Sequence, residues 1–238
     1  MISKVVSLLD AFSPTTPELS LGDLARATGL PVSTTYRLAT ELVEWGGLER
    51  ADRSGYRIGM RLWELGTLAP RGGTLRDVAL PFMQDLYEAT HENVHLAVRD
   101  GLEALYVDTI SGHESVRTRS RRGGRLPLHA TGVGKVLLAH APVDVQRAVL
   151  GNLTRVTSYT ITRPARLEQE LRRVHVDGFA QTSEEMSLGA CSVAVPVRWG
   201  DDVVAAVGIV VASLKRDRGR LLAALQVAAQ GIGRSLGG

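Results

Sequence analysis

Apolar residues at the start of the chain recur at helical spacing. Ile2, Val5, Leu9 and Phe12 repeat every three or four positions, which predicts an amphipathic helix that ends before Pro14. The apolar face of this helix needs a partner to cover it. We therefore expect further helices to follow.

Two more helices are predicted after a segment rich in proline and threonine. Ser20 is a good N-cap for a short helix over residues 21–27. Gly29 suits a tight turn that needs a positive φ, and Pro31 suits the first turn of a third helix that runs to Trp45. Two helices joined by a tight glycine turn are typical of a helix-turn-helix unit.

The third predicted helix has an inner and an outer face. At about 100° per residue, Thr35, Leu38 and Leu42 share the inner face. The outer face and its flanks carry side chains that can bind bases or phosphates, namely Ser33, Thr34, Tyr36, Arg37 and Thr40. We expect this face to enter the major groove of double-stranded DNA.

A short hairpin is predicted directly after the third helix. Residues 48–50 and 56–59 read as two strands around a turn at 52–55, and arginines cluster there. Arg53 and Arg57 are the arginines expected to hold the DNA backbone. The alternative interpretation is a helical hairpin with a solvated basic loop, but three helices followed by a basic wing favour DNA binding.

The remainder of the chain alternates between predicted helices and strands. An apolar helix from Met60 to Leu68, with Trp63, precedes Pro70 and is the expected linker; it either meets a second subunit or is buried in the core. Further elements are expected at 74–90, 95–99, 102–110, 166–176, near Phe179, at 192–198, at 203–211 and in a C-terminal helix. That order predicts an α+β domain whose antiparallel sheet carries helices on one face and encloses a small pocket.

Composition places the chain among ordinary globular proteins. Of its 238 residues, 44% are hydrophobic and 22% are charged. The longest strongly apolar run, 203–212, is too short for a membrane span, which needs about 20 residues, and the start has no signal-peptide pattern. A single cysteine, Cys191, leaves no partner for an internal disulfide or a cysteine-rich zinc site. We expect a cytoplasmic protein that does not bind membranes.

Bulk charge says little about DNA binding in this chain. The formal net charge is +3, yet residues 1–72 hold one lysine and seven arginines against eight acidic residues and are therefore neutral. The surplus comes largely from five arginines, at positions 117, 119, 121, 122 and 125.

Two short motifs suggest enzymes and are rejected. Residues 91–95 match His-Glu-x-x-His, but His95 begins a predicted strand, which places the two histidines roughly 13 Å apart, too far to share a zinc ion. Residues 132–135 resemble the end of a P-loop but lack its first glycine and its Ser or Thr. A glycine-rich turn at a helix N-terminus remains, where free N–H groups suit a carboxylate or the turn simply packs tightly. No cofactor or metal is expected.

Motifs along the whole chain resemble the IclR family of bacterial transcriptional regulators. They are Leu19-Ser20-Leu21, Gly29-Leu30-Pro31, Ser33-Thr34, the run from Leu126 to Lys135, Gly178-Phe179, Glu184-Glu185 with Gly189, and Ala194-Val195-Pro196-Val197. The resemblance implies an α+β fold with a winged helix-turn-helix over 1–59, a linker helix over 60–73 and a GAF-like effector domain over 74–238. It also implies homodimers or homotetramers on palindromic operators.

The same resemblance implies a small organic or aromatic acid as effector. Carried over residue by residue, the effector site comprises Leu126, Gly132, Val133, Thr182, Ser192, Gly208 and Val210. Some relatives have hydroxyl side chains where this chain has Gly208 and Val210, which predicts a larger or more apolar ligand here.

Two rival functions come from other classes. One is an enzyme that uses His129 with Ser192 or Cys191 as nucleophile. The other is a ligand-binding module without affinity for DNA. We expect a regulator rather than an enzyme, and therefore no catalytic residue.

Overall fold

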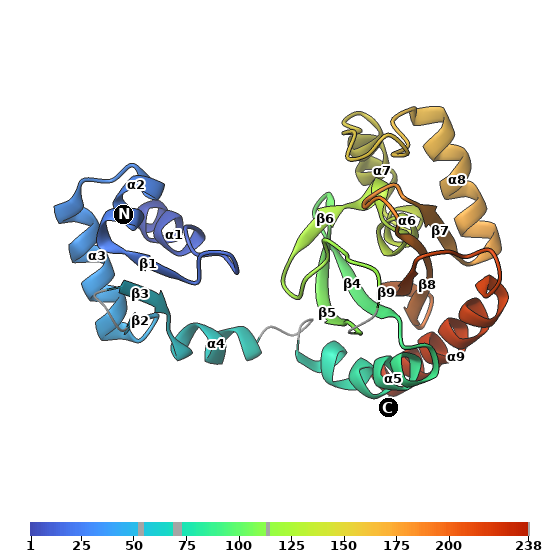
Figure 1. The fold of residues 1–238 in the computed structure, drawn as a ribbon, viewed down its shortest axis with the longest axis horizontal. Helices are drawn as coiled ribbons and strands as arrows, with labels where there is room; N and C mark the ends of the chain where they lie inside the picture. The colour runs from blue at the N-terminus through green and yellow to red at the C-terminus, as the bar shows by residue number, and fades with distance from the viewer. Residues whose placement is uncertain (52–54, 69–72, 113–114, 238) are drawn as a thin grey trace. The chain divides into compact units, whose positions relative to one another are not determined.

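The computed structural model describes residues 1–51, 55–68, 73–112 and 115–237, so Arg53 lies outside the described residues. The chain divides into two compact units, Met1–Gly73 and Thr74–Gly238 (Figure 1). Each unit has its own apolar core, and each is described separately below.

The N-terminal unit combines helices with a small sheet. Its elements are α1 (Ile2–Asp10), β1 (Glu18–Ser20), α2 (Leu21–Thr28), α3 (Val32–Trp45), β2 (Leu48–Ala51), β3 (Gly55–Ile58) and α4 (Met60–Thr67). The sheet is antiparallel in the order β1-β3-β2. The three predicted helices and the hairpin are therefore confirmed.

Strand β1 was not predicted, because the three-residue segment carries no periodic pattern. It exists through its pairing with the wing, in which Leu19 lies opposite Tyr56. Tyr56 in turn packs into the core formed by the three helices, together with Leu8, Leu24 and Leu38. Tyr56 of the wing thereby holds the β2–β3 hairpin against the three helices that precede it.

Local capping defines the helix-turn-helix. Ser20 accepts a hydrogen bond from the Asp23 backbone N–H, and the Asp23 carboxylate accepts one from the Ser20 backbone N–H at 3.1 Å, which completes a capping box. The hydrogen bonds from Ser20 lower the pKa of Asp23. Gly29 ends α2 with a φ of 67°, a left-handed conformation that favours glycine.

The C-terminal unit is built on one antiparallel sheet of six strands in the order β6-β5-β4-β9-β8-β7. Its strands are β4 (Asn93–Asp100), β5 (Glu103–Ile110), β6 (Arg125–Pro127), β7 (Ala180–Ser183), β8 (Cys191–Trp199) and β9 (Asp202–Val211). Its helices are α5 (Gly73–Thr90), the 3-10 turn η1 (Leu128–Ala130), α6 (Gly132–Ala139), α7 (Val143–Leu150), α8 (Pro164–Asp177) and α9 (Arg218–Leu236).

Helices cover both faces of this sheet, which corrects the expectation of a single covered face. Val207 and Ile209 of β9 point into a core with Met83 of α5 and Leu225 of α9. Ala206 of the same strand belongs to a second core on the other face with residues of α6 and α8. Figure 1 shows α5 and α9 on one side of the strands and α6, α7 and α8 on the other. Consecutive residues of β4 and β9 are buried, so both faces of these strands are covered.

Residues 91–95 do not form the helical turn that carries both histidines of a His-Glu-x-x-His zinc site. His91 ends α5 in a left-handed conformation with a φ of 53°, and His95 lies within β4. Among the described residues, no group of three or more histidine, cysteine or acidic side chains is placed to hold a metal ion. Likewise, none of the described helices is long and apolar enough to cross a membrane.

Candidate functional site

The outer face of α3 presents part of the predicted DNA-binding set. Ser33, Tyr36 and Arg37 are exposed, and Thr34 is half-buried. Thr35 lies on the opposite side, where it is fully buried and donates a hydrogen bond to the Pro31 carbonyl at 3.1 Å. The helix thus points the predicted residues outward while its other face packs on the core.

The predicted residues on α3 differ in how free their polar groups are. Arg37 lies 3.6 Å from Glu41, but both side chains are more than half exposed, so this contact holds the guanidinium only weakly. Thr40 is half-buried and donates its hydroxyl hydrogen to the Tyr36 carbonyl at 2.9 Å. Arg37 is accordingly free to reorient, whereas the Thr40 hydroxyl is already engaged.

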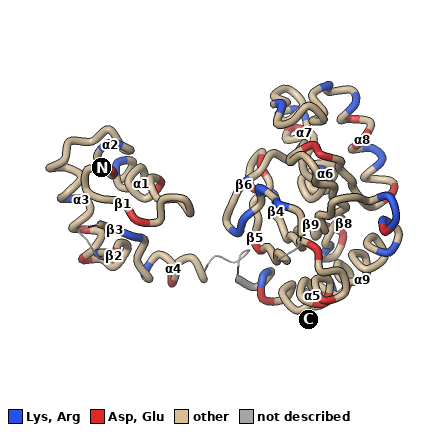
Figure 2. The backbone as a smooth tube through the Cα atoms, in the orientation of Figure 1, with Lys and Arg blue, Asp and Glu red and all other residues tan. Residues whose placement is uncertain are grey.

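Two of the wing arginines contact other residues of the wing. Arg57 donates to Glu49 at 3.1 Å across the β2–β3 pair, and Glu49 also accepts from the Met60 backbone N–H at 3.2 Å. Arg50, another arginine of the cluster expected in the wing, lies with its guanidinium 5.2 Å from the centroid of the Tyr56 ring. Among the described residues Arg50 has no carboxylate within 4.0 Å, and it is exposed, so it is the more available cation. Basic and acidic positions are both scattered along this unit (Figure 2).

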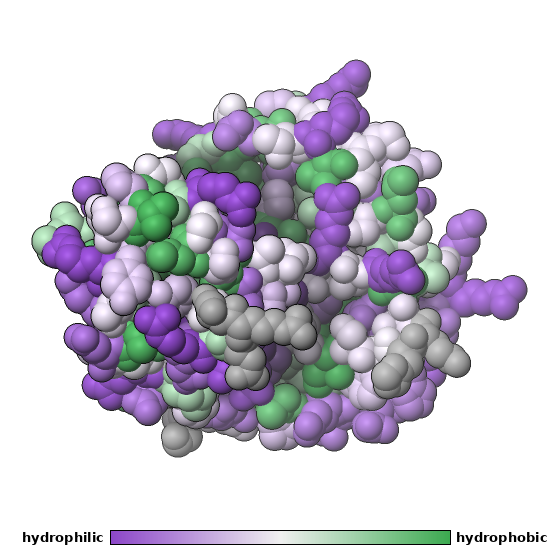
Figure 3. All heavy atoms as spheres, turned by 60° about the vertical axis from the view of Figure 1, so that its left-hand side comes forward, coloured by the Kyte–Doolittle hydropathy of each residue, from purple (hydrophilic) through white to green (hydrophobic). Residues whose placement is uncertain are grey.

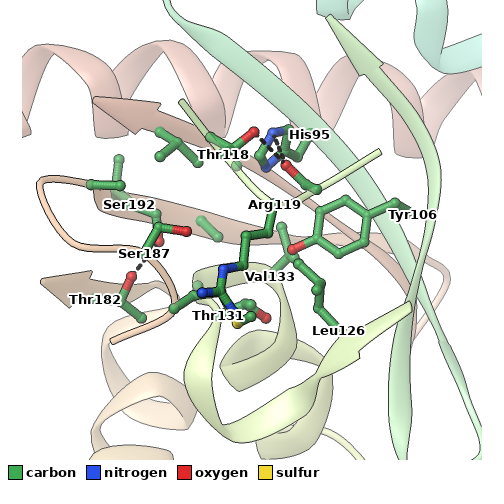
Figure 4. Close-up of a pocket in the computed structure, with 18 residues that line it drawn as sticks. His95, Tyr106, Thr118, Arg119, Leu126, Thr131, Val133, Thr182, Ser187 and Ser192 are labelled. Atoms are coloured by element: carbon green, nitrogen blue, oxygen red, sulfur yellow. Dashed lines mark hydrogen bonds between the residues drawn. The ribbon is translucent and has the colours of Figure 1, made fainter. Parts of the chain in front are cut away.

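A pocket in the C-terminal unit brings together all the predicted effector residues. Leu126, Gly132, Val133, Thr182, Ser192, Gly208 and Val210 line one cavity of about 480 Å³, measured to include its open mouth (Figure 4). It lies between the N-terminus of α6, strands β4, β8 and β9, and the segments 118–120 and 186–190.

Close packing requires glycine at two positions where the chain turns into α6. Thr131 caps the helix by accepting a hydrogen bond from the Gly134 N–H at 3.1 Å. A Cβ atom at Gly134 would collide with the Leu128 carbonyl and the Thr131 hydroxyl, and one at Gly132 would lie 2.5 Å from Ser192 Oγ. The turn therefore packs directly on β8 and brings the helix N-terminus to the pocket.

Most polar groups of the pocket are uncharged. Thr182 and Ser192 share a hydroxyl–hydroxyl hydrogen bond of 2.6 Å. Burial lowers the pKa of His95 to about 4, so its imidazole is neutral at pH 7. Burial also raises the pKa of Tyr106 to about 12, outweighing a hydrogen bond from Thr131 that lowers it.

Arg119 is the one residue with a permanent charge among the described residues that line the pocket. Its side chain extends across the cavity toward Thr131 (Figure 4). Within the described part of the chain, no carboxylate lies within 4.0 Å of its guanidinium and no hydrogen bond engages it. The sequence showed an arginine-rich stretch here but did not indicate which arginine faces the cavity, because that stretch has no regular secondary structure.

The space beside Gly208 corrects one expectation. A Cβ atom there would lie 3.0 Å from the Ala194 Cβ and 3.1 Å from Val133 Cγ1. Neighbouring side chains thus fill the volume that a larger residue would take. The glycine does not by itself provide room for a larger ligand.

A buried ion pair lies behind the pocket wall. Lys135 Nζ of α6 donates to Glu185 Oε1 at 2.6 Å, and the two side chains are 1% and 9% exposed. Burial raises the pKa of Glu185 more than the charge of Lys135 lowers it. The loop after β7 that carries Glu185 also places Met186 and Ser187 in the pocket wall. A lysine within an otherwise apolar helix was the sequence signal for this pair, but its partner is 50 residues away.

Comparison with known proteins decides the family. Residues 1–52 match the IclR helix-turn-helix domain, and residues 71–234 match the C-terminal domain of the bacterial transcriptional regulator IclR. The chain belongs to the IclR family of transcriptional regulators. The resemblance stated from the sequence is thereby confirmed, as is the α+β fold with an N-terminal winged helix-turn-helix.

Individual relatives of this IclR-family chain agree along its full length. It is 32% identical to the HTH-type transcriptional regulator XynR of Escherichia coli, over 99% of this chain and 96% of XynR. It is 33% identical to the glycerol operon regulatory protein of Streptomyces coelicolor, over 92% and 89% of the two chains. The crystal structure of an IclR homologue from Microbacterium hydrocarbonoxydans, complexed with 4-hydroxybenzoate, superposes with a TM-score of 0.95 at 35% identity, covering 99% and 98%.

This IclR-family protein is a DNA-binding transcriptional regulator and not an enzyme. The arrangement of the candidate catalytic residues agrees. His129 Nε2 is 2.9 Å from the Thr154 carbonyl, and Ser192 is bonded to Thr182. Within the described residues no hydrogen bond joins His129 to Ser192 or to Cys191.

Proposed function

We propose that this regulator senses a small aromatic acid in the pocket of its C-terminal unit, and that 4-hydroxybenzoate or a close analogue is the effector. The supporting observation is the unpaired guanidinium of Arg119 in a pocket whose other described lining residues are uncharged at pH 7. A carboxylate is the ligand group that a guanidinium binds with parallel hydrogen bonds. The 4-hydroxybenzoate complex of the Microbacterium homologue supports the same class.

The walls suit the apolar part of such a ligand. Leu126, Val133 and Met186 line the cavity with apolar surface, and Tyr106 adds an aromatic ring. A benzene ring buried there gains hydrophobic free energy, while the acid group stays beside the arginine. The effector changes operator affinity only to the extent that it binds one arrangement of the regulator more tightly than another.

The DNA contacts are proposed from the exposed side chains. Ser33, Thr34, Tyr36, Arg37 and Thr40 of α3 approach base edges or phosphates, and Arg53 and Arg57 hold the DNA backbone. Arg37 contacts only the exposed Glu41 and is the best candidate for a bidentate contact to guanine. Arg50, exposed on the wing, joins the phosphate-binding set.

A homodimer or homotetramer is proposed because α4 carries unpartnered apolar side chains. Met60, Trp63, Leu65 and Leu68 are 58%, 62%, 40% and 74% exposed. Hydrophobic side chains are interspersed with hydrophilic ones on the face shown in Figure 3. A second copy covers the apolar side chains of α4 in an isologous contact, and operator half-sites about 34 Å apart then match the dimer. In this assignment residues 1–59 bind DNA, residues 60–73 link the two units, and residues 74–238 bind the effector.

The proposal is tested with purified protein and its operator, selected from random DNA by the protein itself. Isothermal titration with benzoate and 4-hydroxybenzoate should show binding that Arg119→Gln weakens and Arg117→Gln, an exposed neighbour outside the pocket, leaves intact. Saturating acid should then shift the operator affinity of the wild type in a gel-shift titration. Absence of acid binding, or equal loss in both variants, contradicts the proposed effector class.

A further inference from the structure

His95 is a buried side chain of the pocket that the DNA-binding and acid-binding roles leave unused. It is 4% exposed, faces the pocket from β4, and packs its ring edge-on against Tyr106 at 5.3 Å between centroids. Its cross-strand partner on β9 is Gly208, which has no side chain to cover it. A polar ring in this position needs hydrogen-bond partners for both nitrogens.

The hydrogen bonds around Ser120 determine which nitrogen of His95 carries the proton. Ser120 Oγ donates its single hydrogen to Thr118 Oγ1 at 2.9 Å. Ser120 Oγ is also 2.8 Å from His95 Nε2, and in the arrangement in which Ser120 gives its hydrogen to Thr118 the donor in this contact is Nε2. A neutral imidazole has only one N–H, and Nδ1 is therefore a pure acceptor.

His95 Nδ1 has no hydrogen-bond donor among the described residues. It is also not among the fully buried unpaired atoms of these residues, so an O–H or N–H group of a ligand in the pocket is its natural partner. The Arg119 side chain points away from His95, so that its guanidinium lies near Thr131, and Tyr106 and Leu126 lie to one side of it (Figure 4). The pocket thus has an anion-binding end and a hydrogen-accepting end, and its lining also includes the apolar side chains of Leu126 and Val133.

We propose that the effector is an aromatic acid with a hydroxyl or amino group on the ring carbon opposite the carboxylate, and that His95 Nδ1 accepts the hydrogen of that group. This inference rests on the proposed function, because it assumes that Arg119 binds the carboxylate. His95 then determines specificity, since it distinguishes ring substituents by their ability to donate a hydrogen bond and not by their size.

Matched ligands test this on the unaltered protein. Isothermal titration should rank 4-hydroxybenzoate and 4-aminobenzoate about 10- to 100-fold tighter than 4-methylbenzoate, which has similar size but no donor. In His95→Phe this ratio should fall to near one, whereas His95→Gln, whose amide oxygen accepts a hydrogen bond, should retain part of it. Nitrogen-15 NMR of the histidine rings should show the Nε2–H form in the free protein and a shift at Nδ1 when 4-hydroxybenzoate binds.

The outcomes separate the inference from the function on which it rests. Equal affinities of the wild type for the hydroxyl and methyl acids, or an Nδ1–H form, overturn the role of His95 while leaving an aromatic-acid effector intact. Failure of all four acids, including benzoate, to bind overturns both. Circular dichroism checks that each variant is folded, and if His95→Phe does not fold, the ligand series and the NMR on the wild type still decide.

Discussion

Removing one partner of the Lys135–Glu185 pair should strongly destabilise the C-terminal unit. In Lys135→Met the Glu185 carboxylate keeps its buried position but loses the 2.6 Å contact with the ammonium group. An uncompensated buried charge costs about 3–5 kcal/mol, which is a large share of the roughly 5–15 kcal/mol that stabilises a typical protein. Replacing both partners, in Lys135→Met with Glu185→Gln, should recover most of that loss, because no buried charge remains.

The pH dependence of the loss follows from the pKa of Glu185. Burial already raises it, and Lys135 is the main group that lowers it, so removing Lys135 raises it further. A carboxyl group whose pKa is raised by folding stabilises the fold while protonated, and this contribution is lost as pH rises through the folded-state pKa. The deficit of Lys135→Met relative to wild type should therefore be larger at pH 8 than at pH 5.

Urea unfolding followed by circular dichroism at both pH values measures these differences. Lys215→Met makes the same substitution at an exposed lysine and should leave the free energy of unfolding within about 0.5 kcal/mol of wild type. A loss below about 1 kcal/mol for Lys135→Met, or an equal loss at pH 5 and pH 8, would refute the reasoning.

Three further predictions concern single side chains. Lowering the pH from 7 to 5 should reduce the free energy of unfolding by roughly 1–2 kcal/mol through His95. Its pKa of about 4 in the folded protein lies below the ordinary 6.5, so the unfolded chain takes up the proton first as the pH falls. Urea titrations of His95→Gln should lack this pH-dependent loss. Arg37→Ala should weaken operator binding by about 1–3 kcal/mol in gel-shift titrations, while Arg172→Ala on exposed α8 should not, and equal affinities would remove Arg37 from the interface. Ser20→Ala should cost the N-terminal unit about 1 kcal/mol in thermal unfolding, whereas Ser20→Gly should cost only a few tenths; a Ser20→Ala unfolding curve that overlays wild type would exclude the capping box with Asp23.

The sequence alone determined the parts of this protein that depend on neighbouring residues. Helical periodicity, the Ser20 cap, the Gly29 turn and the wing hairpin are local signals, and the structure confirms each as an element. Motifs along the chain were sufficient to identify the family, because they combine glycine turns with apolar strands in one order. The residues expected to bind the effector were carried over from those motifs and lie around one pocket.

Tertiary structure decided what depends on residues far apart in the chain. Strand β1 exists because it pairs with β3. One face of the larger sheet is covered by α5 and α9, from opposite ends of the domain, and the other by α6 and α8 from its middle. Lys135 pairs with Glu185, which lies 50 residues further along the chain. Arg119 and His95 line the same pocket from separate segments of the chain. Periodicity reports only which face of its own element a side chain occupies, so the partner that gives a charge or a ring nitrogen its chemistry is set by long-range packing.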